Sequence, residues 1–88
     1  MECEWDPEKA TSNARKHGVR FADAVTALED EHGVTVRDAG EGEERWVTIG
    51  MNDAGRLLTV VFTWRGDRVR IISARRASPR ELRIYEER

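Results

Sequence analysis

Two tight turns divide residues 45–74 into three stretches with the pattern of β-strands, and this arrangement constrains the fold more than any other feature of the chain. Arg45 to Met51 alternates between two sets of side chains, as a strand does. Leu57 to Trp64 is almost entirely apolar or β-branched, which is typical of a central strand. Arg68 to Ala74 forms the third stretch, and Asn52 to Gly55 and Arg65 to Asp67 have the composition of turns. The sequence therefore predicts an antiparallel meander.

Three segments are predicted to be helical. The first runs from Pro7 to about His17, with Asp6 as N-cap and Gly18 as the left-handed residue that ends it. The second covers about Phe21 to Asp30, where apolar residues recur at helical spacing. The last begins at Ser78-Pro79-Arg80-Glu81, which combines an N-cap serine, a first-position proline and a glutamate three residues after the cap.

Two shorter strands complete the prediction. Glu2 to Trp5 alternates polar and apolar residues, and Val34 to Arg37 is the second short strand. Ala39 to Glu43 is predicted to be a flexible loop because it contains two glycines. The order is β-α-α-β-β-β-β-α. This is an α+β fold with two N-terminal helices and one C-terminal helix packed on a twisted antiparallel sheet, because the helices must cover one face of the sheet.

The length of 88 residues predicts a single domain, 1–88, with one core. Charge is unevenly distributed. Residues 1–55 hold 6 Lys/Arg and 13 Asp/Glu, whereas residues 56–88 hold 9 Arg and 4 Asp/Glu. A basic C-terminal segment of this kind can attract phosphates even though the chain has a net charge of −2. A solvated arginine-rich surface is the simpler interpretation.

Residue types also limit the location and the cofactors. The single cysteine, Cys3, allows no internal disulfide, which suits a reducing, cytoplasmic compartment. No apolar run approaches the length of a membrane span, and no signal peptide is recognisable. His17 and His32 lack further ligands at metal-binding spacing, so we expect neither a metal nor another cofactor.

Four segments, taken in order, resemble the BrnT toxins of type II toxin–antitoxin systems. They cover nearly the whole chain, and the ordered set is more specific than any one of them. The segments are Trp5-Asp6-Pro7 with Lys9, Asn13 and Lys16 to Phe21; Glu44-Arg45 with Ile49-Gly50; Gly55 to Leu58 with Val60-Val61 and Thr63 to Gly66; and Arg70 to Ala77 with Glu81 and Tyr85. Arg20 stands where a small capping residue is usual.

The resemblance implies a fold like that of the RelE ribonuclease toxins and an endoribonuclease that cleaves RNA and inhibits translation. It also implies a partner, a BrnA-like ribbon-helix-helix antitoxin that neutralises the toxin. DNA would then be contacted only indirectly, through the antitoxin. The alternative is a non-catalytic RNA- or protein-binding module that seats a partner protein, because a fold alone does not establish catalysis.

RNA cleavage without a metal ion proceeds through attack of the ribose 2′-OH on the adjacent phosphate. It needs a base, an acid and cations that stabilise the added negative charge. We expect Arg65, Arg70 and Arg75 to grip phosphate and Arg68 and Arg76 to contact RNA, because a planar guanidinium suits a bidentate contact. Strand alternation predicts Arg68, Arg70 and Arg76 on one side and Arg75 on the other, although both end residues could reach the rim. Pairing with the acidic N-terminal half is the alternative.

His17 and Glu44 are two of the candidates for proton transfer. His17 is an acid or base near neutral pH, although its place at a helix end also suits a plain C-cap. Glu44 is a candidate base because it opens a strand opposite the basic ones. It could equally form an ion pair with Arg45 or Arg70.

Five further residues complete the candidate site. Tyr85 could donate a proton or stack on a base, or be an ordinary tyrosine at the edge of the core. Lys9 and Lys16 could contact RNA, or be simply solvated. Trp46 and Trp64 could provide stacking platforms if one sheet face is open, or pack in the core.

Overall fold

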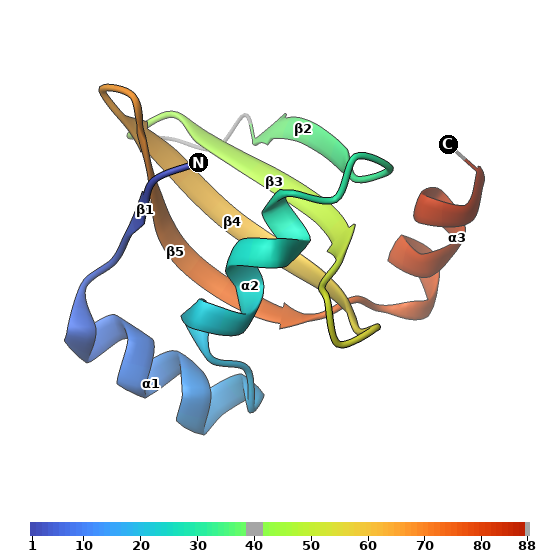
Figure 1. The fold of residues 1–88 in the computed structure, drawn as a ribbon, viewed down its shortest axis with the longest axis horizontal. Helices are drawn as coiled ribbons and strands as arrows, with labels where there is room; N and C mark the ends of the chain where they lie inside the picture. The colour runs from blue at the N-terminus through green and yellow to red at the C-terminus, as the bar shows by residue number, and fades with distance from the viewer. Residues whose placement is uncertain (39–41, 88) are drawn as a thin grey trace.

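The computed structural model, which describes residues 1–38 and 42–87, has the predicted order β-α-α-β-β-β-β-α (Figure 1). The elements are β1 (Cys3–Glu4), α1 (Pro7–His17), α2 (Phe21–Leu28), β2 (Val34–Asp38), β3 (Arg45–Met51), β4 (Leu57–Arg65), β5 (Arg68–Arg76) and α3 (Pro79–Glu87). The predicted α+β class is confirmed. Of the predicted loop from Ala39 to Glu43, residues 39–41 lie outside the described residues.

The five strands form one sheet in the order β1-β5-β4-β3-β2. The strands β2 to β5 are an antiparallel meander, as the two tight turns predict. The short strand β1 pairs with β5 in parallel, so the sheet is mixed rather than wholly antiparallel. A parallel partner needs a long crossover, and the chain supplies it by placing α1, α2 and the strands β2 to β4 between β1 and β5.

The predicted boundaries of α1 are confirmed. The Asp6 carboxylate accepts hydrogen bonds from the backbone N–H groups of Glu8 (2.8 Å) and Lys9 (3.4 Å), and Pro7 occupies the first turn. Gly18 ends the helix with φ at 69°, a conformation that is strained for residues with a side chain.

Helix α2 ends at Leu28, two residues earlier than predicted. Asp30 is withdrawn from the helix because its carboxylate accepts hydrogen bonds from the backbone N–H groups of His32 (3.0 Å) and Met51 (2.8 Å). Aspartate competes with helix geometry through such bonds to nearby backbone. Asp30 thereby joins the end of α2 to the end of β3.

Helices α1 and α2 cover one face of the sheet, and the core lies between them and that face (Figure 1). We call it the helix-covered face. Its buried residues are Val19, Phe21, Ala24, Ala27, Leu58, Val60, Phe62, Val69, Ile71 and Ala74. Gly50 of β3 is essential to the packing, because a Cβ atom there would collide with the backbone carbonyl of Ala27 in α2. None of the helices in the described ranges is long and apolar enough to cross a membrane.

Helix α3 begins with the predicted capping box. The Ser78 hydroxyl accepts from the Glu81 N–H (3.2 Å), and the Glu81 carboxylate accepts from the Ser78 N–H (2.8 Å). Unlike α1 and α2, α3 buries none of its described residues fully, and Leu82 and Ile84 remain about 40% exposed (42% and 41%). It contacts the sheet at β3 and lies beside one end of it (Figure 1).

Candidate functional site

The face of the sheet opposite α1 and α2 carries a row of arginines, and we call it the arginine face. Arg65 and Arg68 are register partners at the tip of the β4–β5 hairpin. Arg70 pairs with Thr63 and Arg75 with Thr59, which places both on the same side as Arg65. At about 3.3 Å per residue along β4, Arg70 and Arg75 are separated by roughly 13 Å at the backbone.

A β-bulge brings Arg75 to this face. Val61 pairs with Ser73 but Phe62 pairs with Ile71, so Ile72 is an extra residue on β5. An extra residue reverses the alternation of side chains beyond it, because successive residues of a strand point to opposite faces.

The predicted grouping of the arginines by alternation is therefore wrong. Arg75 lies with Arg68 and Arg70, whereas Arg76 pairs with Leu58 and belongs to the helix-covered face. The three predicted phosphate ligands, Arg65, Arg70 and Arg75, share one face. The sequence shows that the arginines belong to one segment, but it contains no residue pattern that predicts the β-bulge.

Each arginine of the row lies against a carboxylate. The contacts are Arg65–Glu43 (3.3 Å), Arg68–Glu2 (3.2 Å), Arg70–Glu4 (2.8 Å) and Arg75–Glu81 (2.7 Å). The partners of the first three belong to the acidic N-terminal half, which the sequence offered as the alternative. Most of these groups are half exposed, so each such pair contributes about 0–1 kcal/mol to stability and can exchange partners.

Arg75 has the most regular of these contacts. Its Nη1 and Nη2 atoms donate to the two carboxylate oxygens of Glu81 at 2.7 and 2.9 Å, which is the bidentate geometry that a phosphate would also accept. The hydrogen bonds from Arg75, aided by the Ser78 N–H and opposed by burial, lower the pKa of Glu81 to about 2. Glu81 thus holds α3 to β5 and Arg75 in place.

Tyr85 anchors the other end of α3. Its hydroxyl donates to the Asp30 carboxylate at 2.6 Å, and the same oxygen accepts from the Met51 N–H. Burial would raise the pKa of Asp30, but these hydrogen bonds, with one from the His32 N–H, hold it below its usual value. Tyr85 therefore lies half-buried at the junction of α2, β3 and α3 rather than in the arginine row.

The remaining candidates lie away from the row. Lys9 and Lys16 are exposed on α1, and His17 is half-buried at its C-terminal end. Within the described ranges no hydrogen bond or ion pair joins His17 to the row. Glu44 forms an ion pair with Arg37 of β2 at 2.8 Å, not with Arg45 or Arg70.

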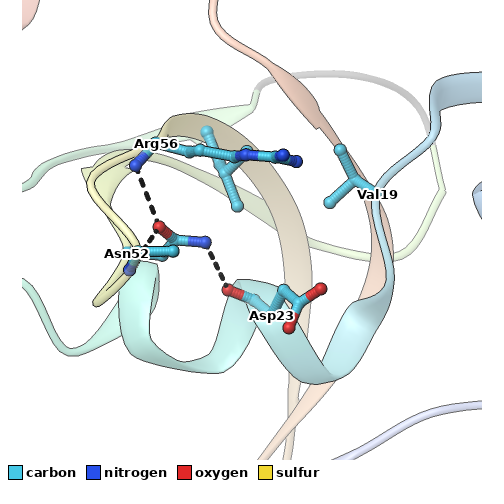
Figure 2. Close-up of a pocket in the computed structure, with 6 residues that line it drawn as sticks. Val19, Asp23, Asn52 and Arg56 are labelled. Atoms are coloured by element: carbon cyan, nitrogen blue, oxygen red, sulfur yellow. Dashed lines mark hydrogen bonds between the residues drawn. The ribbon is translucent and has the colours of Figure 1, made fainter.

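Two of the cavities lie on the helix-covered side, and the candidate stacking residues Trp46 and Trp64 line the second of them. The first, about 200 Å³, lies between Val19, Asp23, Asn52 and Arg56 (Figure 2). Asn52 is buried there, and Figure 2 shows its hydrogen bonds. Its amide donates to the Asp23 carbonyl (3.2 Å) and accepts from the Arg56 N–H (3.0 Å), which fixes the β3–β4 turn. The second, about 310 Å³, is apolar and lined by Trp46 and Trp64, so these rings face away from the arginine row.

Two residues of structural or chemical importance were missed. Asn13 is buried and bonds to the backbone of β5. Glu4 lies on the arginine face between Arg68 and Arg70. The alternation of Glu2, Cys3, Glu4 and Trp5 could have indicated that both glutamates lie on one side of the first strand. No group of three or more potential metal ligands occurs among the residues described.

Comparisons with known proteins agree with this fold. Residues 5–81 match the family described as the ribonuclease toxin, BrnT, of type II toxin–antitoxin systems. Among solved structures, the chain is similar to the crystal structure of the Brucella abortus ribonuclease toxin BrnT. Their sequence identity is 28% and the TM-score is 0.66, with 89% of this chain and 97% of that chain covered. Curated protein sequences gave no match.

Fold and comparison together define the class as ribonuclease toxins of type II toxin–antitoxin systems. The chain belongs to the BrnT family. The resemblance based on four ordered segments is thus confirmed, and family membership makes the chain an endoribonuclease. Type II membership also implies RNA as target and an antitoxin as partner.

Proposed function

We propose that the arginine face binds and cleaves the RNA backbone. The observation that supports this proposal is the alignment of Arg65, Arg68, Arg70 and Arg75 on the face that α1 and α2 leave uncovered. Cations in a row along the paired strands β4 and β5 can contact successive phosphates of a single RNA strand. Each guanidinium has five N–H donors, so an arginine can bind a phosphate either in place of its carboxylate partner or together with it.

The reaction we propose is attack of a ribose 2′-OH on the adjacent phosphate, with the arginines stabilising the charge that develops on phosphorus oxygens. Guanidinium groups supply this stabilisation directly, so we propose that the cleavage needs no metal ion. Arg65, Arg70 and Arg75 act on the phosphate, and Arg68 contacts the flanking backbone. Arg76, Lys9 and Lys16 face other directions and at most extend the contact with a longer RNA.

The geometry gives less support to the other candidate residues. His17 belongs to α1, behind the sheet, and Glu44 is engaged by Arg37. Tyr85 anchors α3 through Asp30. We therefore place the chemistry on the arginine face and assign Tyr85 to the support of α3.

Arginine variants test this proposal. We expect Arg70→Ala and Arg75→Ala each to lower the rate of RNA cleavage by about 10- to 100-fold, because a charge-assisted hydrogen bond contributes about 1.5–3 kcal/mol. Growth arrest on expression of the toxin alone should weaken in parallel. Cleavage should persist in the presence of EDTA.

Arg15→Ala is the matched control, because Arg15 is an exposed arginine on α1, away from the row. It should cleave RNA at the wild-type rate. Circular dichroism should show that all three variants are folded. Wild-type cleavage by both Arg70→Ala and Arg75→Ala would contradict the proposal, and failure of the wild-type protein to cut RNA would favour a non-catalytic binding module.

We also propose that the antitoxin is BrnA-like, with a ribbon-helix-helix domain, and that the toxin contacts DNA only through it. An acidic segment of such a partner would complement the arginine face and block RNA. The reducing environment that suits the unpaired Cys3 agrees with a cytoplasmic location.

A further inference from the structure

One carboxylate lies within the arginine row with an oxygen that accepts no hydrogen bond from the residues that the structure describes. Glu4 of β1 is the register partner of Arg70, and its Oε2 accepts from Arg70 Nη1 at 2.8 Å. Its Oε1 lies 3.9 Å from Arg68 Nη1, which is too far for a hydrogen bond. The side chain is 32% exposed, so a substrate can reach it.

The other carboxylates of the face are less suited to accept a proton. Both oxygens of Glu81 are bonded to Arg75, and one also accepts from the Ser78 N–H. Glu43 contacts Arg65 at 3.3 Å from the loop before β3, with a half-exposed side chain. The Glu2 side chain is 73% exposed at the outer margin of β1, and its carboxylate forms an ion pair with Arg68.

Arg70 links Glu4 to the position of a bound phosphate. In the described residues only Nη1 of Arg70 donates to a protein acceptor, which leaves Nε and Nη2 available. Because the guanidinium is a rigid planar fork, a phosphate held by these atoms would lie beside the carboxylate held by Nη1. A ribose on the 5′ side of that phosphate carries the 2′-OH that attacks it.

From this arrangement we infer that Glu4 is the general base of the RNA cleavage described above, and the inference rests on that proposed function. Glu4 Oε1 takes the proton of the 2′-OH as the 2′ oxygen forms a bond to phosphorus. The bond between phosphorus and the 5′ oxygen breaks, and the 5′ oxygen takes a proton from an acid or from water. The products are a 2′,3′-cyclic phosphate and a 5′-hydroxyl, and Glu4 then releases its proton to water.

Glu4→Gln tests the inference because glutamine keeps the shape and can still accept a hydrogen bond from Arg70, but it cannot serve as a base at neutral pH. We expect kcat for a short single-stranded RNA to fall by about 100-fold or more, since a general base contributes about 10²–10⁴-fold. KM should change little. The activity of the wild-type protein should fall on the acidic side of its pH profile. The residual activity of the variant should show no such fall.

Glu2→Gln is the matched control, because Glu2 belongs to the same end of the chain and contacts the same Arg68. It should retain the wild-type kcat. Glu4→Asp should recover part of the lost rate, because it restores a carboxylate at a shorter reach.

The outcomes separate the inference from the function on which it rests. Near-normal kcat for Glu4→Gln, or a raised KM with unchanged kcat, would overturn the inference, since the second result shows that Glu4 only positions Arg70. The proposed function would survive both results. Absence of RNA cleavage by the wild-type protein would overturn both.

Discussion

At the scale of a single residue, Asn13 provides hydrogen-bond partners for the outer edge of β5. Strand β1 covers only part of that edge, because it pairs with Val69 and Arg70 alone. Further along, the Asn13 amide takes the place of a neighbouring strand: Oδ1 accepts from the Ala74 N–H (3.1 Å) and Nδ2 donates to the Ala74 carbonyl (2.8 Å). Nδ2 also donates to the Val19 carbonyl at 2.9 Å.

We expect Asn13→Ala to lower the free energy of unfolding by about 2–4 kcal/mol, because it leaves three buried backbone groups without partners. Asn13→Asp should be at least as harmful, since a carboxylate cannot donate to the two carbonyls. Urea denaturation followed by tryptophan fluorescence measures both. Ser12→Ala, on the exposed side of the same helix, should change the free energy by less than about 0.5 kcal/mol. A loss for Asn13→Ala as small as that of the control would show that water replaces the amide.

Helix α3 depends on hydrogen-bonded carboxylates rather than on burial. Glu81 connects it to Arg75 and Tyr85 connects it to Asp30, while Leu82 and Ile84 stay partly exposed. The folded state lowers the pKa of Glu81 from 4.5 to about 2 and also lowers that of Asp30. A carboxyl group whose pKa is lowered by folding stabilises the fold above its unfolded pKa, and this stabilisation is lost as the pH falls through the folded value.

We therefore expect α3 to detach from the sheet as the pH falls from about 4.5 to about 2. The NMR chemical shifts of the amides of residues 79–87 should change over this range. They should change at a higher pH than the shifts of the β4 amides, because the core does not depend on these carboxylates. Glu81→Gln should show the detached shifts at neutral pH. Glu86→Gln, on an exposed position of the same helix, should not. Detachment of wild-type α3 only together with the unfolding of β4 would contradict this account.

At the scale of the whole molecule, the sheet separates two surfaces. The arginine face carries the row that we assign to RNA, and the opposite side carries α1, α2 and the two cavities described above. An antitoxin that neutralises the toxin by occlusion must cover the arginine face. One bound to the helix-covered side would leave the row open.

We expect hydrogen–deuterium exchange of the toxin–antitoxin complex to show protection of β4 and β5 residues around Arg65 and Arg70. Excess single-stranded RNA should displace the antitoxin equally well from the wild-type protein and from Arg15→Ala. It should displace the antitoxin less well from Arg70→Ala. Protection confined to α1 and α2 with the arginines still exposed would contradict occlusion.

The sequence alone determined the elements and the family. The caps at Asp6, Gly18 and Ser78 act within a few residues, and the turns between residues 51 and 57 and around Gly66 join adjacent strands, so local chemistry was sufficient to predict α1, the meander and the start of α3. The ordered segments identified the BrnT family for the same reason, since they are properties of the chain and not of its folding.

Only the tertiary structure decided which side chains share a surface. The bulge at Ile72 moved Arg75 to the face of Arg70, and the parallel pairing of β1 brought Glu4 there from the other end of the chain. The bulge interrupts the pairing of two strands joined by a short turn, and the β1 pairing joins strands distant in sequence. Residue spacing encodes neither the extra residue nor the distant pairing. The opening prediction of three strands and two turns was correct, but the composition of the face they form was a property of the folded sheet.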